Sequence, residues 1–298
     1  MKRRKMKRVL IVGSGDVACR IIPWLVRRFR VCAVVRRPEE RSTLRALGAT
    51  PILADLDRPG SLDRLAGIAD YVLHCAPPPG EGLDDPRTRR LLAALAGRGS
   101  LPRRLVYIST TGVYGDCAGA WLDETRPLRP ASARAVRRVA AETHLRGFGR
   151  RTGCRVSLLR APGIYDGGAR LPIARLQKGD PVLAPEDDVF TNHIHADDLG
   201  RLLALALFRG RPNRVYNASD DSGLRMGEYF DLVADATGLP RPPRLPRAAL
   251  AERLSALTLS FMSESRRLSN ARIKRELRVR LLYPNVAAAL AARLKSDS

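Results

Sequence analysis

A glycine-containing stretch near the start of the chain has the residue types and spacing that could bind a phosphate group. Gly13, Gly15 and Ala18 follow the apolar residues 9–12 in the pattern G-x-G-x-x-A. Gly13 permits a tight turn after a strand, Gly15 lets a pyrophosphate approach the backbone, and Ala18 lets the next helix pack closely. The N-terminus of that helix would offer free N–H groups to the anion. The stretch therefore predicts a dinucleotide site, and the alternative is a turn that uses glycine only for packing.

The residues that follow a second apolar run bear on which dinucleotide binds. Arg36 and Arg37 come directly after residues 31–35. Sites that prefer NAD usually carry Asp or Glu at this position, where the carboxylate binds the ribose hydroxyls. An arginine can instead hold a 2′-phosphate through its planar guanidinium. This pair favours NADP over NAD, although two solvated arginines in an arginine-rich chain would look the same.

Two later apolar runs also end in residues that could line this site. Asp55 and Leu56 follow the third run, and the Asp55 carboxylate could accept a hydrogen bond from the adenine amino group or could cap a helix instead. His74 ends the fourth run and is expected to pack rather than to catalyse. The full set of contacts expected from the first four strand ends is Gly13, Ser14, Gly15, Asp16, Val17, Arg36, Arg37, Asp55, Leu56, Cys75, Ala76 and Pro77.

The elements that must position these residues alternate between short apolar strands and amphipathic helices. The predicted strands are 8–12, 31–35, 51–54, 70–75, 104–109 and 155–160, and the helices between them are 16–29, 39–47, 61–66, 84–97 and 131–148. This alternation is typical of an α/β fold with a doubly wound parallel sheet, the Rossmann fold. We expect residues 1–160 to form this NAD(P)-binding domain.

The pattern changes after residue 160. Glycine and proline become frequent, a helix is predicted over 197–208 and a strand over 214–217, and an arginine-rich helical tail follows. We expect residues 161–298 to complete the sheet and to form a small C-terminal lobe. That lobe would bind the substrate over the carboxyl edge of the sheet, where ligands of open α/β folds bind.

The charge of the chain raises the question of a nucleic-acid partner. Lys and Arg number 53 against 30 Asp and Glu, for a formal net charge of +23. The arginines are spread over all the predicted helices, and the one dense basic cluster is residues 2–8. Because no aromatic platform or zinc-finger spacing accompanies it, the sequence argues against a nucleic-acid partner.

Other compositional features exclude several classes of site and location. The five cysteines stand singly, without C-x-x-C or Cys/His spacing, so we expect neither a metal site nor disulfides. No apolar run approaches the roughly 20 residues that span a bilayer. Gly13 and Gly15 interrupt the first apolar run too early for an export signal. We therefore expect a cytoplasmic protein with no membrane partner.

Several motifs in the second half of the sheet resemble one enzyme family, and they do so in the same order. Residues 107–115 read Tyr-Ile-Ser-Thr-Thr-Gly-Val-Tyr-Gly, residues 159–165 read Leu-Arg-Ala-Pro-Gly-Ile-Tyr, and residues 190–198 read Phe-Thr-Asn-His-Ile-His-Ala-Asp-Asp. They resemble motifs of the extended short-chain dehydrogenase/reductase (SDR) superfamily, in its NAD(P)-dependent epimerase/dehydratase branch. Residues 123–130 and 274–284 resemble the loop before the family's catalytic helix and its closing segment, so the resemblance covers nearly the whole chain.

The resemblance also assigns the catalytic positions. In this family a Ser or Thr, a Tyr, and a Lys four positions after the Tyr carry the hydride chemistry. The resemblance places Thr110 at the hydroxyl position, with Ser109 beside it, and places Arg134 and Arg138 at the Tyr and Lys positions. Arginine cannot act as a general base near neutral pH. Arg138 is still expected to hold the nicotinamide ribose, and Ser109 is also expected to contact the cofactor.

The lost tyrosine raises the question of a replacement acid. Tyr114 and Tyr165 are the nearest candidates, and Tyr114 is included among the expected catalytic residues with Thr110, Arg134 and Arg138. His195 is expected to form a structural hydrogen bond with Asp198 rather than a proton relay.

The resemblance implies an atypical extended SDR that binds NADP and acts as an oxidoreductase or an epimerase-like enzyme. Arginines near the expected cleft suit a small anionic substrate, such as a sugar nucleotide; they are Arg134, Arg138, Arg160 and Arg170. The alternative is a non-catalytic NADP(H)-binding regulator or scaffold, because both family catalytic residues are replaced. The resemblance also implies a homodimer through residues 84–97 and 131–148.

Overall fold

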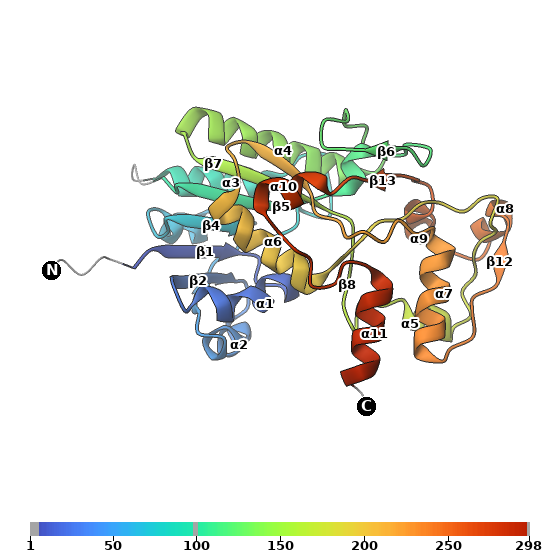
Figure 1. Cartoon of the computed structure of the whole chain (residues 1–298). Coiled ribbons are helices and arrows are strands. Elements are labelled where there is room, and N and C mark those ends of the chain that lie inside the picture. The colour runs from blue at the N-terminus through green and yellow to red at the C-terminus, as the bar shows by residue number, and fades with distance from the viewer. Residues whose placement is uncertain (1–5, 98–100, 297–298) are drawn as a thin grey trace.

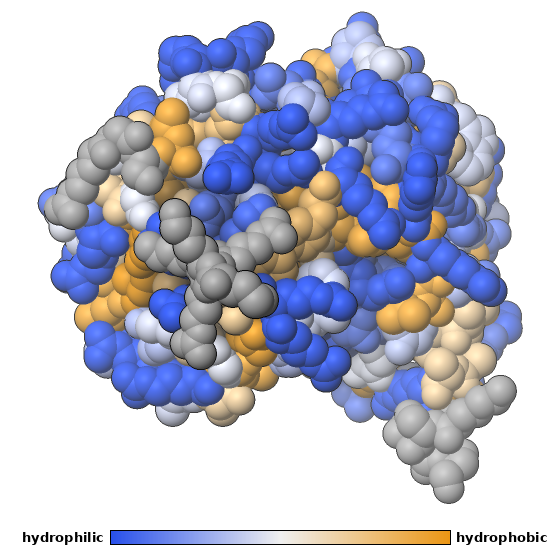
Figure 2. Space-filling model, turned by 60° about the vertical axis from the view of Figure 1, so that its left-hand side comes forward, coloured by the Kyte–Doolittle hydropathy of each residue, from blue (hydrophilic) through white to orange (hydrophobic). Residues whose placement is uncertain are grey.

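The architecture is described from a computed structural model, which covers residues 6–97 and 101–296. Most of the basic cluster predicted at the N-terminus therefore lies outside the described residues. None of the described helices is long and apolar enough to cross a membrane. Hydrophilic side chains are spread over the face shown in Figure 2, with apolar patches between them.

A seven-stranded parallel sheet forms the centre of the molecule (Figure 1). Its strands are β1 (Arg8–Val12), β2 (Arg30–Val35), β3 (Thr50–Leu53), β4 (Tyr71–His74), β5 (Arg104–Thr110), β7 (Arg155–Ala161) and β11 (Arg214–Asn217). Their order across the sheet is β11-β7-β5-β4-β1-β2-β3, and every neighbouring pair is parallel. The predicted α/β Rossmann fold is confirmed. The strand order reverses between β1 and β4, and ligands of doubly wound sheets bind at the carboxyl ends beside that point.

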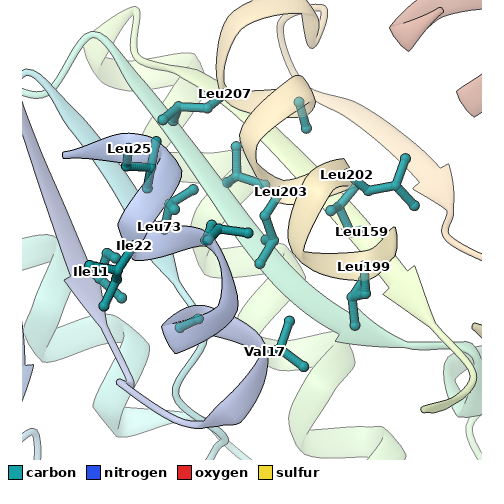
Figure 3. Packing of buried hydrophobic residues seen from close by; sticks show 14 of the residues in the cluster. Ile11, Val17, Ile22, Leu25, Leu73, Leu159, Leu199, Leu202, Leu203 and Leu207 are labelled. Atoms are coloured by element: carbon teal, nitrogen blue, oxygen red, sulfur yellow. The ribbon is translucent and has the colours of Figure 1, made fainter. Parts of the chain in front are cut away.

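Helices cover both faces of the sheet because each strand is apolar on both sides. On one face, α1 (Asp16–Leu25), α2 (Arg41–Ala46), α6 (Ala196–Arg209) and α10 (Ala271–Leu277) share a buried apolar core with the strands. Figure 3 shows Ile22 and Leu25 of α1 beside Leu203 of α6, over Ile11 and Leu73 of the sheet. On the other face lie η2 (Pro59–Leu65), α3 (Pro86–Ala96) and α4 (Ala133–Thr152).

Residues after β7 form a second core beyond the carboxyl ends of the strands (Figure 1). Its helices are α5 (Ile173–Gln177), α7 (Met226–Thr237), α8 (Arg247–Ala251), α9 (Ala256–Phe261) and α11 (Val286–Ser296), and the pair β9 (Val182–Leu183) and β12 (Arg244–Leu245) joins them. Two further parallel pairs are β8 (Gly163–Tyr165) with β10 (His193–His195), and β6 (Trp121–Leu122) with β13 (Arg267–Leu268). Residues after 160 also contribute β11 and α6 to the central layers.

Several predicted helices have different bounds in the structure. The helix predicted over 16–29 ends at Leu25, two residues after Pro23, and turns at Arg28 and Phe29 return the chain to β2. The segment predicted over 61–66 is the 3-10 helix η2, and the one over 39–47 begins as the 3-10 turn Pro38–Glu40. Helix α4 runs on to Thr152, where Gly153 ends it in the left-handed conformation.

Candidate cofactor site

The turn between β1 and α1 is shaped by two glycines with different requirements. Gly13 has a φ of +93°, and a Cβ there would lie 2.3 Å from the backbone nitrogen of Ala76. Only glycine therefore lets the chain after β4 pack against this turn. A Cβ on Gly15 would meet nothing within 4 Å, so the space over its backbone is open. Because Gly15 is also the N-cap of α1, no side chain of its own covers the first N–H groups of the helix.

A pocket of about 250 Å³ opens between this turn and the carboxyl ends of β2, β3 and β4. Eight residues predicted for the cofactor line it: Gly13, Ser14, Gly15, Arg36, Asp55, Leu56, Ala76 and Pro77. The predicted contacts Asp16, Val17, Arg37, Cys75, Ser109 and Arg138 are not among its lining residues. The structure adds the charged residues Glu40 and Arg87 and the apolar residues Val12, Val34, Val35 and Ala54.

Two charged residues of the pocket, Glu40 and Arg87, form ion pairs with residues outside its lining. Arg36 is exposed at the end of β2 and faces the pocket. Arg37 turns instead to Glu40, and hydrogen bonding to this guanidinium lowers the pKa of the Glu40 carboxyl. Arg87, in the first turn of α3, donates to both carboxylate oxygens of Asp57 and to carbonyl oxygens of the loop after β4. Two guanidinium groups, those of Arg36 and Arg87, therefore border the pocket.

Asp55 lies at the pocket and does not cap a helix, because the N-cap residue of η2 is Arg58. It lines the pocket, and its Oδ1 accepts a hydrogen bond of 2.9 Å from the backbone nitrogen of Asp57. This bond shapes the turn after β3. Within the described residues Oδ2 makes no hydrogen bond, so it remains available to an adenine amino group.

His74, at the end of β4, is buried below the pocket. Its Nε2 lies 2.8 Å from the Thr88 hydroxyl, which is 2.6 Å from a carboxylate oxygen of Asp85. Since the carboxylate can only accept, Thr88 donates to Asp85 and His74 donates to Thr88. Burial lowers the pKa of His74 to about 3 and raises that of the neighbouring Cys75 to about 12. Both side chains therefore stay uncharged near neutral pH.

Helix α4 carries Arg134 and Arg138, the two arginines that the sequence predicted at the catalytic positions, and their side chains contact different elements. Arg138 Nη1 donates to the Tyr107 hydroxyl at 2.8 Å and to the Ile108 carbonyl at 2.7 Å, against strand β5. Arg134 is exposed, and its guanidinium lies 4.5 Å from the ring centroid of Phe261 in α9. The sequence of α4 contains no Tyr and no Lys.

The hydroxyl residues at the end of β5 also differ in their surroundings. Ser109 donates to Glu142 at 2.7 Å, and the same carboxylate receives two hydrogen bonds from Arg160. This buried group fixes α4 on the sheet and leaves Ser109 occupied. Thr110 Oγ1 accepts a bond of 3.3 Å from the Gly112 nitrogen. Because Thr110 only accepts here, its own O–H remains available to a ligand.

The structure does not support the predicted catalytic role of Tyr114. Its side chain is buried, its hydroxyl donates to Asn217 at 2.7 Å, and burial raises its pKa to about 12. Tyr165 is buried as well and donates to Asp220 at 3.0 Å. Neither hydroxyl faces the pocket, because each is bound inside the protein.

The expected hydrogen bond between His195 and Asp198 is absent from the described residues. His195 Nδ1 accepts from the Asp197 nitrogen at 3.2 Å, and its ring lies against Tyr283. The Asp198 carboxylate instead accepts from the backbone nitrogens of Leu282 and Tyr283. Asp198 sits in the first turn of α6, where it binds the segment before α11.

A parallel doubly wound sheet, with a glycine turn and an open pocket beside its reversal point, defines a dinucleotide-binding protein of the Rossmann class. Residues 13–208 match the family model described as NAD(P)H-binding, and the chain belongs to this family. The expectation of an NAD(P) site is thereby confirmed. A search of curated proteins gave no match.

Solved structures with the same fold include known enzymes. The chain is similar to a functionally unknown conserved protein from Silicibacter pomeroyi, with 31% identity, a TM-score of 0.81, and 98% and 100% of the two chains covered. It is also similar to the UDP-glucose 4-epimerase of Thermotoga maritima, with 17% identity, a TM-score of 0.76 and coverage of 98% and 100%. A third similar structure is a dTDP-glucose 4,6-dehydratase from Streptomyces venezuelae with NAD and TYD bound. Its identity is 22%, its TM-score is 0.76, and 97% of this chain and 96% of that chain are covered. At these identities the two enzymes show a shared fold.

Proposed function

We propose that the protein binds NADP(H) in preference to NAD(H). The observation that carries this proposal is Arg36, which follows β2 where an NAD site would present a carboxylate, and which lines the pocket beside the glycine turn. Arg87 lies on the same rim, but its guanidinium is bound to Asp57 and to the loop after β4. The Glu40 carboxylate, which also lines the pocket, is paired with Arg37.

The residues that line the pocket fit the adenosine and pyrophosphate parts of a dinucleotide. The Gly13–Gly15 turn would take the pyrophosphate, Asp55 the adenine and Arg36 the 2′-phosphate. Arg138 would hold the nicotinamide ribose from α4. When bound, the cofactor supplies or accepts a hydride. The protein's part is to orient it and to hold the substrate against it.

We further propose an oxidoreductase or epimerase/dehydratase-like activity on a small anionic substrate. The free O–H of Thr110 could donate to a substrate carbonyl at the end of β5. Arg134 is exposed at the start of α4, where it could bind a phosphate. One protein of similar fold is described with bound UDP-glucose, which makes sugar nucleotides the first substrates to test.

Two measurements test this proposal. Thermal unfolding with NADP, NADPH and NAD should show the largest stabilisation with NADPH or NADP, since a ligand that binds the native state raises its stability. NADPH oxidation is then followed over a panel of carbonyl compounds and sugar nucleotides. Tight NADPH binding without turnover of any substrate would argue against the enzymatic part.

A non-catalytic NADP(H)-binding regulator is the second candidate, and a specific observation favours it. Helix α4 has no Tyr or Lys, and both Tyr114 and Tyr165 have their hydroxyls bound inside the protein. The double variant Arg134→Tyr/Arg138→Lys restores the family pair. Turnover that appears only in this variant would favour the regulator, and turnover by the natural protein would favour the enzyme.

A further inference from the structure

The turn after β8, residues 166–170, lies against the N-terminal part of the cofactor helix α1. Asp166 closes this turn, because its Oδ1 accepts hydrogen bonds from the backbone nitrogens of Gly168 at 2.9 Å and Arg170 at 3.0 Å. These bonds fix the point from which the Arg170 side chain leaves the turn.

An ion-pair cluster ties the turn to α1. Arg20 of α1 binds three carboxylates, those of Asp16 at 2.9 Å, Asp197 at 2.8 Å and Asp166 at 3.2 Å. The first belongs to α1, the second to the start of α6 and the third to the turn. One guanidinium therefore holds three segments of the chain together beside the glycine turn.

Arg170 also belongs to the cluster, through Asp16. Its Nε lies 3.1 Å from Asp16 Oδ2. Asp16 is the first residue of α1 and directly follows Gly15, over whose backbone the space is open. Within the described residues, Nη1 and Nη2 of Arg170 have no hydrogen-bond partner, and 35% of the side chain is exposed.

The charges of this cluster matter for an anionic ligand. Three carboxylates (Asp16, Asp166 and Asp197) meet two guanidiniums (Arg20 and Arg170), which leaves one net negative charge. Without Arg170 the cluster would carry two. A pyrophosphate over Gly15 would lie beside the Asp16 carboxylate, so its binding needs a compensating cation with free N–H groups.

We propose that Arg170 is a cofactor-binding residue, which stays on Asp16 through Nε and donates from Nη1 and Nη2 to the pyrophosphate of the dinucleotide. This inference rests on the proposed NADP(H) binding. It makes the segment after β8 part of the cofactor site, beside the N-terminus of α1.

Calorimetric titration of the full chain with three ligands tests the assignment. NADPH and 2′-phospho-ADP-ribose both contain the pyrophosphate, whereas 2′-AMP contains only the adenosine end. Arg170→Gln should weaken the first two by about tenfold or more and should leave 2′-AMP unchanged. Arg241→Gln serves as the matched control, because Arg241 forms an exposed ion pair with Asp235 in the second lobe.

Each outcome separates this inference from the proposal on which it rests. If the natural protein binds no NADPH, the proposed function is wrong and the inference is overturned with it. If the natural protein binds NADPH and Arg170→Gln binds it equally well, only the inference is overturned. Equal weakening of 2′-AMP would also overturn it, because the loss would not follow the pyrophosphate. An unchanged unfolding temperature of ligand-free Arg170→Gln shows that the fold is intact.

Discussion

Arg37 donates two hydrogen bonds, of 2.9 and 2.6 Å, to a single carboxylate oxygen of Glu40 at the rim of the cofactor pocket. Glu40 lines the pocket and Arg37 does not. The pair thus reduces the negative field that Glu40 would direct at a 2′-phosphate. We therefore predict that substitutions of Arg37 and of Glu40 change the affinity for NADPH in opposite directions.

Arg37→Gln should weaken NADPH binding about threefold and leave NADH binding nearly unchanged, because an exposed pair has a modest effect. Glu40→Gln should tighten NADPH binding by a similar factor. Fluorescence titration of both cofactors at low salt measures the change. Equal effects on NADPH and NADH would mean that the pair acts on something other than the 2′-phosphate.

The two glycines of the turn should respond differently to the same substitution. Gly13→Ala should lower the free energy of unfolding by about 2 kcal/mol or more, because its φ is positive and the added Cβ would overlap Ala76. Gly15→Ala should leave the ligand-free stability nearly unchanged, since nothing lies within 4 Å of its Cβ position. It should instead weaken NADPH binding by filling the pyrophosphate space. Urea unfolding and cofactor titration of both variants check this contrast, and equal stability losses would contradict it.

The buried ion pair between Glu142 and Arg160 should be essential to stability. Both side chains are 2% exposed, and their closest contact is 2.6 Å. Glu142→Gln leaves the Arg160 charge buried without a counter-ion, which should cost about 3–5 kcal/mol in urea unfolding. Asp235→Asn breaks an exposed pair with Arg241 and should leave the unfolding midpoint in place. Similar midpoints for the two variants would show that the buried pair contributes little.

His193 should make the protein sensitive to acid. Burial lowers its pKa to about 3, whereas the unfolded chain binds the proton near pH 6.5. The stabilisation from the neutral ring is complete above pH 6.5 and is lost as the pH falls toward 3, because the unfolded state then binds more protons. His193→Phe keeps the ring contact with Tyr229 and should reduce the pH dependence of unfolding by up to about 1.4 kcal/mol per pH unit between pH 6 and 4. An unchanged slope would show that His193 does not titrate on unfolding.

The sheet could be predicted from the sequence because buried parallel strands are nearly continuous apolar runs. The 3-10 turns and the early end of α1 were missed because local packing decides them. The glycine turn could be predicted because the positive φ of residue 13, and the closeness of Ala76 to it, permit only glycine there, and this requirement is visible in the sequence. The difference between Arg36 and Arg37 depends on side-chain direction, and adjacent residues after a strand point to opposite sides. That alternation was the available signal that only one of them faces the pocket.

Other parts of the site depend on contacts between distant segments. Arg87 reaches the pocket only because α3 begins beside the loop after β4, and Glu40 only because a 3-10 turn follows β2. The V-Y-G motif indicated the family but not that Tyr114 would bind Asn217, which lies 103 residues later in the chain. Long-range partners of this kind have no local signature in the sequence.

Preference for NADP(H) is the central claim, and one titration tests it most directly. The natural protein is titrated with NADPH and with NADH by calorimetry at a single low ionic strength. If the Arg36 guanidinium binds the 2′-phosphate, NADPH should bind about tenfold or more tightly than NADH, which lacks that phosphate. Equal affinities, or tighter binding of NADH, would contradict the claim.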